Sequence, residues 1–458
     1  MFKKVLVANR GEIAVRVIRT LKEMGIKSVA IYSSADADSL HVKLADEAIS
    51  VGGPKSKDSY LNMKNILSAA LLAGDEAIHP GYGFLSENEL FVEMAEAVGL
   101  KWIGPSPKVI ELMGNKANAR ESMRAAGVPV IPGSEGFIRD ATEAKAVADR
   151  VGYPLLLKAA AGGGGKGMRF VYSADELADN FDDAQREAKA AFGDEHMYVE
   201  KVMENVRHIE MQVMRDRFGN VLYFPERNCS LQRNNQKVME ESPALGVTQE
   251  MRDNLGEIAT KAVNALQYEN TGTLEFLQDH DGNFYFMEMN TRIQVEHPVT
   301  EMVTGVDLIR MQIEVAAGEP LSVSQADIAL KGHALEVRLN AEQPAKNFAP
   351  SAGTIDFVFL PTGGPGIRID SAIYAGDKIQ PFYDSMIGKL LVHANNRADA
   401  VTKMDRILDE LVVHGVSTNA EFQKALLHDP TVARGMFDTR YLEKEFLPRW
   451  QASLPKAD

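Results

Sequence analysis

The chain contains 458 residues, and its 50 basic and 64 acidic side chains give a formal net charge of −14. A chain of this length predicts two or three domains, and the acidic balance argues against a protein that binds nucleic acid or an anionic membrane. Cys229 is the only cysteine, which excludes an intrachain disulfide and favours an inert buried thiol in a reducing compartment. Since the sequence contains neither a secretion signal nor an apolar run long enough to span a membrane, we expect a cytoplasmic protein.

Strands and helices alternate in the first quarter of the chain. Residues 4–8 read as a buried strand, and apolar residues then recur at helical spacing from Ile13 to Met24, before a helix stop at Gly25. Further strands are predicted at 28–32, 77–78 and 102–104. This alternation predicts an open, mostly parallel α/β domain over residues 1–113.

A second unit begins near Gly127. Its pattern predicts helices over 141–151 and 174–190, and strands over 155–158, 168–172 and 197–202. We expect residues 131–203 to form a small α+β unit that moves as a lid.

The rest of the chain reads as hairpins and helices. Hairpins are predicted over 210–224 and 273–289, with a helix over 250–266 between them. Beyond Gly332 the pattern changes to strands separated by glycine-rich turns, so we place a domain boundary near residue 330. A final helix is expected over 399–411.

A glycine run joins two of the predicted strands of the lid. It is no Walker A loop, because Gly167 follows Lys166 where Ser or Thr is required. Its spacing fits the dinucleotide fingerprint, but a strand follows it where that fingerprint requires a helix. The pattern favours a strand–loop–strand hairpin that covers phosphates, with a plain surface turn as the alternative.

Two carboxylates are opposed in the second hairpin. Asp281-Gly282 is a strong two-residue turn signal, and outward pairing sets Glu275 against Glu288. Like charges in that position are destabilising, whereas a divalent cation removes the repulsion, with Asn290 as a further oxygen ligand. The alternatives are a shifted register or two side chains in solvent.

Polar residues continue at alternate positions after this hairpin. Arg292, Gln294 and Glu296 point the same way in an extended chain, where an arginine beside a carboxylate could hold a small anion and remove its proton. A surface ion pair fits the spacing equally well.

At these motifs the sequence resembles the biotin carboxylase family of the ATP-grasp superfamily. The resemblance covers essentially the whole chain and implies an α/β fold: the N-terminal domain at 1–113, an ATP-grasp domain at 114–330 that includes the lid at about 131–203, and a C-terminal α+β domain at 331–446. The matching stretches are Ala8–Ala14, His79–Asn88, Lys158–Gly167, Glu226–Arg233, Glu288–Pro298 and Tyr383–Lys389.

The resemblance implies a role for each residue that matches a family motif. The nucleotide-binding positions are Lys116, Lys158, Gly164, Gly165, Glu200, Lys201, Val202, Met203, His208, Gln232, Asn235, Glu275 and Glu288. The implied ligands of Mg²⁺ or Mn²⁺ are Glu275, Glu288 and Asn290, and the implied bicarbonate contacts are Lys237, Arg292, Gln294 and Val295. Glu296 matches the general base, Arg338 the residue that stabilises the biotin enolate, and Tyr82 a position near biotin.

One position departs from the family pattern. Many members carry a histidine where Asn235 stands. An asparagine still donates a hydrogen bond but lacks the positive charge, so we expect activity to be retained and nucleotide affinity to be affected.

The implied activity is carboxylation of biotin by ATP and bicarbonate, as in the first half-reaction of a bacterial acetyl-CoA carboxylase that serves fatty-acid synthesis. The chain contains no Ala-Met-Lys-Met site for biotin attachment, so we expect a separate biotin carboxyl carrier protein and carboxyltransferase subunits, and the family is commonly homodimeric. The alternatives are a subunit of a pyruvate or propionyl-CoA carboxylase, another ATP-grasp ligase that acts on an amine, and a non-catalytic ATP-binding subunit.

Overall fold

The computed structural model describes residues 1–159 and 167–454. Gly164 and Gly165, which the sequence assigns to nucleotide binding, lie outside the described residues. No helix of the described part is long and apolar enough to cross a membrane.

The N-terminal part is a five-stranded parallel sheet with helices on both faces. Alternate residues of its strands enter different cores: Val5 and Val7 lie in one, and Leu6 and Ala8 in the other. A parallel sheet is buried on both faces in this way. The strands, in the spatial order β3-β2-β1-β4-β5, are β1 (Lys4–Val7), β2 (Lys27–Ser33), β3 (Glu47–Gly52), β4 (Ala77–His79) and β5 (Lys101–Trp102), and the helices are α1 (Gly11–Glu23), α2 (Leu40–Leu44), α3 (Met63–Ala73), α4 (Glu89–Ala97) and α5 (Pro107–Gly114). The parallel α/β prediction is confirmed.

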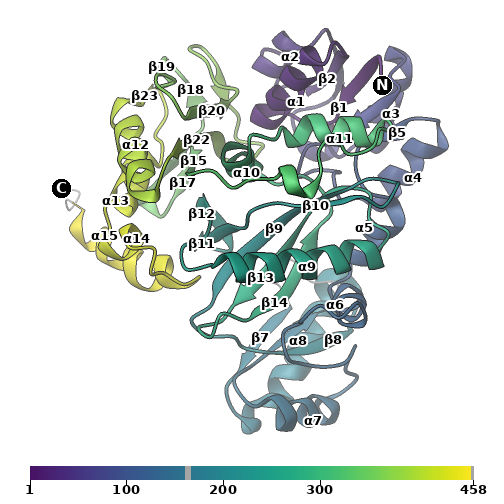
Figure 1. Ribbon diagram of the computed structural model, residues 1–458, viewed down its shortest axis with the longest axis vertical. Helices are drawn as coiled ribbons and strands as arrows, with labels where there is room; N and C mark the ends of the chain where they lie inside the picture. The colour runs from purple at the N-terminus through teal and green to yellow at the C-terminus, as the bar shows by residue number, and fades with distance from the viewer. Residues whose placement is uncertain (160–166, 455–458) are drawn as a thin grey trace.

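The predicted lid is a separate small unit at the lower end of the molecule in Figure 1. Its three-stranded antiparallel sheet and two helices enclose a core of their own, which includes Leu155, Phe181 and Val199. The elements are β6 (Leu155–Ala159), β7 (Met168–Val171), β8 (Met197–Lys201), α7 (Ala141–Val151) and α8 (Leu177–Phe192), and α6 (Lys116–Ala125) precedes them. The predicted helices and strands of this region are confirmed.

A large antiparallel sheet forms the centre of the molecule. Its strands, in the order β14-β13-β9-β11-β12-β15-β22-β20 with β10 beside β9, are β9 (Arg207–Arg215), β10 (Val221–Tyr223), β11 (Arg227–Arg233), β12 (Gln236–Ser242), β13 (Asn270–Gln278), β14 (Phe284–Asn290), β15 (His333–Asn340), β20 (Ile367–Ser371) and β22 (Met386–Ala394). Because β12 pairs with β15, one sheet runs through the boundary that the sequence places near residue 330.

Helix α9 (Gln249–Ala265) covers one face of this sheet and packs on Ile209, Met211 and Val213 of β9. His208 and Glu210 occupy the alternate positions of β9 and point to the opposite face because side chains alternate along a strand. Helices α10 (His297–Thr304) and α11 (Leu308–Ala316) follow β14 in the chain.

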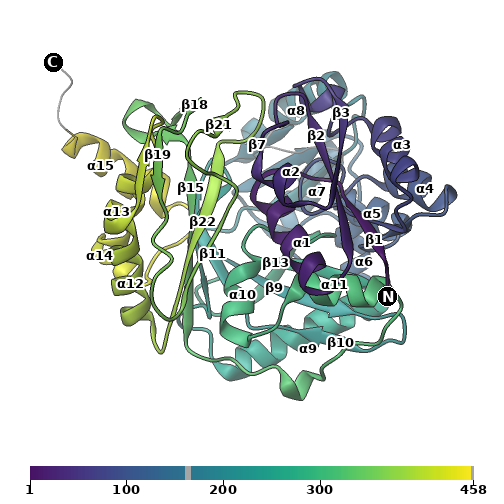
Figure 2. The ribbon, with the colours of Figure 1, turned by 90° about the horizontal axis from the view of Figure 1, so that it is seen from above.

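The C-terminal helices pack on β15 and β22 around Phe422 and Leu426, and they lie together at one side of the molecule (Figure 2). They are α12 (Arg397–Glu410), α13 (Ala420–Leu427), α14 (Pro430–Ala433) and α15 (Leu447–Ser453), and short pairs involve β16 (Glu342–Gln343), β17 (Ala349–Pro350), β18 (Gly353–Thr354), β19 (Phe357–Phe359), β21 (Lys378–Ile379) and β23 (Val412–His414). The prediction that the helix at 399–411 is the last is therefore wrong. The later helices are too short for a strong periodic signal.

Asp75, just before β4, gives a test of the N-terminal packing. Its carboxylate oxygens find no hydrogen-bond partner among the described residues, and burial raises its pKa to about 7. A raised carboxyl pKa favours the protonated form in the folded state, so the stability of the protein falls as pH rises from about 4 to about 7. We expect Asp75→Asn to exceed the wild type in free energy of unfolding by about 1–3 kcal/mol at pH 8 and to match it near pH 4.

Urea unfolding of both proteins at the two pH values measures this difference. A gap between wild type and Asp75→Asn that does not change with pH would show that the carboxylate is better solvated than its surroundings indicate.

Candidate functional site

The β13–β14 hairpin brings Glu275 and Glu288 opposite each other, as the sequence predicts. The predicted two-residue turn is wrong, however: Asp279 N donates to Asn283 O at 3.1 Å, which leaves a three-residue loop. The register then shifts by one residue between Glu275 and Phe276. The longer loop and this shift cancel, so the two carboxylates are still paired.

A third carboxylate extends the row. Glu210 of β9 pairs directly with Glu275, so acidic residues occupy matched positions on three neighbouring strands. Sequence reasoning missed Glu210. The available signal was the alternation of polar His208, Glu210 and Gln212 with apolar residues along β9, which shows a strand with one polar face.

Buried cations hold this row together. Lys237 Nζ of β12 lies 2.5 Å from Glu210 and 2.9 Å from Glu275, and it also pairs with Glu296. Arg227 Nε donates to Glu210 at 2.5 Å, and both side chains are fully buried. Burial by itself raises the pKa of Glu210, but Arg227 and Lys237 outweigh it and hold that pKa below its usual value. The site is thus a network of buried charges that depend on one another.

His208 completes the positive side of the network. Its Nε2 lies 3.2 Å from Glu275. Burial lowers the pKa of His208, but the charge of Glu275 together with hydrogen bonds to both Glu210 and Glu275 outweighs it and raises the pKa to about 9. The imidazole is therefore a cation at neutral pH, which suits a neighbour of phosphate groups.

Glu296 lies beside the neighbouring strands β12 and β15 of the central sheet. Arg338 of β15 reaches Glu296 at 3.1 Å and Glu240 of β12 at 2.6 Å. Burial raises the pKa of Glu296, but Lys237 and Arg338 lower it overall. Its carboxylate is therefore ionised and able to accept a proton.

The segment after β14 is not the extended chain that the sequence suggested. β14 ends at Asn290, and residues 291–296 bend and turn into α10. Arg292, Gln294 and Glu296 nevertheless face one cavity, because the turn brings them together where a strand would have spread them along its length.

Hydrogen bonds fix the side chains of this segment. Arg292 donates to Glu87 of the N-terminal part at 2.8 Å and to Asn290 Oδ1 at 2.9 Å. Gln294 donates to Glu275 at 2.7 Å. Glu87 lies within a matched family motif, but nothing in its local pattern showed that it would hold Arg292.

A cavity of about 740 Å³ collects most of the predicted site residues. Its lining includes Lys116, Lys158, Glu200, Lys201, Val202, Met203, His208, Gln232, Asn235, Lys237, Glu275, Glu288, Asn290, Arg292, Gln294, Val295, Glu296 and Arg338. Tyr82 is not among them. Tyr82 donates a hydrogen bond to Glu12. Lys389 Nζ lies 5.9 Å from the centroid of the Tyr82 ring and donates to the carbonyl oxygen of Val295, a cavity residue, at 2.9 Å.

The backbone accounts for the asparagine at position 235. Asn234 and Asn235 have φ values of 49° and 61° and lie between the paired residues Arg233 and Gln236. A two-residue hairpin loop with two positive φ values favours asparagine over most side chains.

The chain matches three family models: "Biotin carboxylase, N-terminal domain" over residues 1–110, "Carbamoyl-phosphate synthase L chain, ATP binding domain" over 115–324 and "Biotin carboxylase C-terminal domain" over 336–444. The chain belongs to the biotin carboxylase family. It is therefore an ATP-dependent ligase with the mixed α/β fold that the sequence predicted. The bounds 1–113, 114–330 and 331–446 stay a prediction.

Relatives of the biotin carboxylase family carry several names. The chain is 51% identical to biotin carboxylase 1 of Bacillus subtilis (strain 168), over 97% of this chain and 98% of that protein. It is 50% identical to a subunit of pyruvate carboxylase from Methanothermobacter thermautotrophicus, over 97% and 90%. The biotin carboxylase domain of Hydrogenobacter thermophilus 2-oxoglutarate carboxylase, solved as a dimer with MgADP, ADP and bicarbonate, superposes with a TM-score of 0.93 at 50% identity and covers 100% of both chains.

The three residues predicted to bind magnesium carry the type of donor atom that this ion prefers. Glu275, Glu288 and Asn290 supply oxygen donors from two paired strands to one cavity, and hard oxygen ligands suit Mg²⁺ and Mn²⁺. Glu288 lies 3.4 Å from Lys116, and Asn290 donates to Glu275 at 2.9 Å. The assignment of these three residues as ligands stays a prediction.

Glu210 gives a stability test of the charge network. Glu210→Gln leaves Arg227 and Lys237 buried with less negative charge, and we expect the free energy of unfolding to fall by about 3–5 kcal/mol. The matched control is Glu314→Gln, which breaks the helical i,i+4 pair of Glu314 with Arg310 and should cost about 0.5 kcal/mol. Urea unfolding measures both, and equal losses would contradict the network.

Proposed function

We propose that this chain carboxylates biotin on a separate biotin carboxyl carrier protein, with ATP and bicarbonate as co-substrates. The observation that carries the proposal is the position of Glu296. Its ionised carboxylate pairs with Lys237 and Arg338 in the same cavity as the Glu275–Glu288 pair. A base, two cations and a set of metal ligands are what phosphorylation of bicarbonate requires.

Nucleotide binding would use the part of the cavity next to the lid. Lys116 and Lys158 would hold phosphates, and the backbone of 200–203 would line the adenine together with apolar side chains such as Leu277 and Met287. Glu275, Glu288 and Asn290 would hold Mg²⁺, which when bound neutralises negative charge on the phosphates. The MgADP and bicarbonate in the Hydrogenobacter structure support this assignment.

The first step forms carboxyphosphate. Bicarbonate binds at Lys237, Arg292 and the backbone of Val295, and Glu296 takes the proton of its hydroxyl group. The freed oxygen attacks the γ-phosphorus of ATP, and the bond from that phosphorus to the bridging oxygen breaks, which releases ADP. Lys237 stabilises the charge that develops on the transferred group. Its pairing with both Glu296 and Glu275 supports this role, since one ammonium group would then reach the proposed base and a proposed metal ligand.

The second step transfers the carboxyl group to biotin. The C–O bond of carboxyphosphate breaks to give CO₂ and phosphate, the phosphate takes the proton from N1 of biotin, and N1 then attacks CO₂. Arg338 and Arg292 stabilise the enolate form of biotin, with Tyr82 near its ring. Arg338 is well placed for this because Glu240 and Glu296 hold it from two sides.

The acceptor proposed for the carboxyl group is acetyl-CoA, in cytoplasmic fatty-acid synthesis, through a carboxyltransferase subunit. The ground for this choice is the sequence resemblance to a separate subunit of bacterial acetyl-CoA carboxylase, because the name of the Bacillus relative specifies no acceptor. The relatives named for pyruvate and 2-oxoglutarate carboxylases give the second candidate, and reconstitution with each carrier and acceptor distinguishes the two. A homodimer is proposed from the dimeric Hydrogenobacter structure.

Replacing the proposed base tests the proposal. Wild-type protein should release ADP from MgATP only when bicarbonate is present, and faster with free biotin. Glu296→Gln should lower kcat by about 10²–10⁴-fold because the proton acceptor is lost. A coupled ADP assay measures both, with Glu410→Gln, which breaks an exposed helical pair with Arg406, as the control.

Three outcomes would contradict the proposal. ADP release that does not respond to bicarbonate or biotin would favour another ATP-grasp ligase. Full activity in folded Glu296→Gln would show that Glu296 is not the general base. Tight ATP binding without turnover in the wild type would favour the non-catalytic role.

A further inference from the structure

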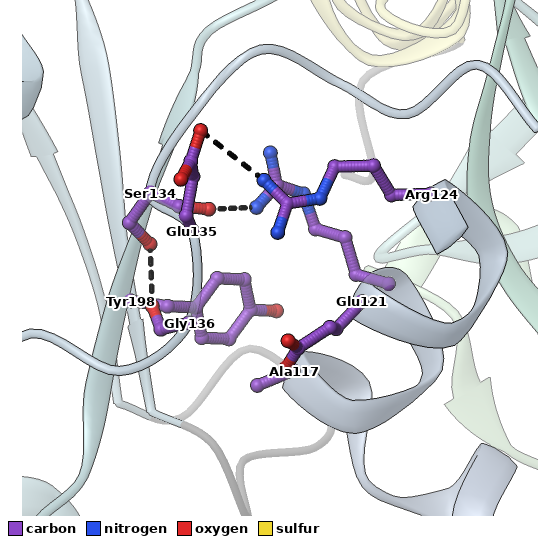
Figure 3. A pocket seen from close by; sticks show the side chains of 8 residues that line it. Ala117, Glu121, Arg124, Ser134, Glu135, Gly136 and Tyr198 are labelled. Atoms are coloured by element: carbon purple, nitrogen blue, oxygen red, sulfur yellow. Dashed lines mark hydrogen bonds and ion pairs between the residues drawn. The ribbon is translucent and has the colours of Figure 1, made fainter. Parts of the chain in front are cut away.

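Arg120 lies on α6, one helical turn after Lys116. Its guanidinium donates to the carbonyl oxygens of Ile131 and Ser134, in the chain segment that leads from α6 into the lid. Its side chain is 12% exposed. Figure 3 shows the small cavity between one side of α6 and residues 134–136, and Arg120 is among the residues that line it.

The segment that Arg120 holds is fastened to β8. Ser134 N donates to Val199 O at 2.8 Å, and Lys201 N donates to Pro132 O at 2.7 Å. A Cβ atom on Gly133 would lie 2.1 Å from Val199 O, so the two backbones approach too closely for any side chain. Arg120 is therefore connected to the strand whose end forms the start of the proposed adenine-lining segment.

The third nitrogen of the guanidinium faces Glu200. Arg120 Nε lies 3.9 Å from Glu200 Oε1, and Glu200 Oε2 pairs with Lys158 of β6. Both members of the Glu200–Lys158 pair are largely buried, where an ion pair is sensitive to its neighbouring charges. Arg120 of α6 thus holds two carbonyl groups at the entry to the lid by hydrogen bonds and places its charge within ion-pair distance of the carboxylate that holds Lys158.

We propose that Arg120 is a positioning residue for the nucleotide, which fixes the Lys116 helix, the Glu200–Lys158 pair and the adenine-lining strand relative to one another. The proposal rests on the proposed function only in taking ATP as the ligand. The planar guanidinium suits this role because it donates to two carbonyl oxygens in fixed directions while its charge lies near the Glu200 carboxylate, which a lysine ammonium on a flexible chain does not do.

Arg124 is a matched control. It lies one turn further along α6 and lines the same cavity, and Figure 3 shows its pairing with Glu135. That pair is 3.3 Å long, and the side chains are 42% and 64% exposed. Because this exposed pair holds neither Glu200 nor the backbone that Arg120 binds, loss of Arg124 should leave the nucleotide site as it is.

The test measures MgATP binding by calorimetry, together with steady-state kinetics, for the wild type and for Arg120→Met, Arg120→Lys and Arg124→Met. We expect Arg120→Met to raise Kd and KM for ATP by about tenfold or more, which corresponds to about 1.4 kcal/mol. At saturating ATP, kcat and the KM for bicarbonate should change less than about twofold. Arg120→Lys should fall between Arg120→Met and the wild type, and Arg124→Met should match the wild type.

Unchanged ATP affinity in folded Arg120→Lys and Arg120→Met would overturn the proposal, as would an equal rise in Arg124→Met. If Arg120→Met does not fold, Arg120→Lys decides by the same measurement. A wild type that binds MgATP without bicarbonate-dependent turnover would contradict the proposed function, while the affinities would still test Arg120.

Discussion

Three carboxylates opposed on neighbouring strands are the constraint on which this site depends. Glu288, Glu275 and Glu210 occupy one row across β14, β13 and β9, and two of them are buried. Like charges in such a row repel, and burial strengthens the repulsion. Lys237 relieves it by pairing with Glu210 and Glu275 at once.

Lys237 also connects this row of carboxylates to Glu296, the proposed general base. Lys237 also pairs with Glu296, which Arg338 approaches from β15. A bound cation at Glu275 would compete with Lys237 for the negative charge, and an anion next to Lys237 would release Glu296. Burial and loss of the lysine contact both raise a carboxylate's affinity for a proton. The proposed binding of metal and bicarbonate would therefore be coupled to the basicity of Glu296.

The sequence predicted those parts of the site that depend on local pairing. The opposition of Glu275 and Glu288 was correct because the turn signal and the alternation of the strand fixed the register to within one residue. The predicted turn was wrong in its length, and a one-residue shift next to Glu275 compensated for it. The same strand pattern correctly placed Asn290 at the end of β14, two residues after Glu288.

Long-range contacts were beyond local reasoning. Glu210 joins the row through the pairing of β9 with β13, whose sequence separation is large. Arg338 meets Glu296 only because β15 continues the central sheet beside β12, although the sequence suggested a boundary there. Family resemblance supplied Arg338, Lys237 and His208, whereas Glu210, Arg227 and Glu87 required the structure.

The proposed function requires that bicarbonate itself attacks the γ-phosphate. The most direct measurement is the fate of oxygen-18 from labelled bicarbonate in a short incubation of the wild type with MgATP and biotin. Attack by bicarbonate predicts one labelled oxygen in each phosphate released, because the bridging oxygen of carboxyphosphate stays with phosphorus when its C–O bond breaks. Phosphate without the label would show that water attacks ATP and would contradict the role given to Glu296.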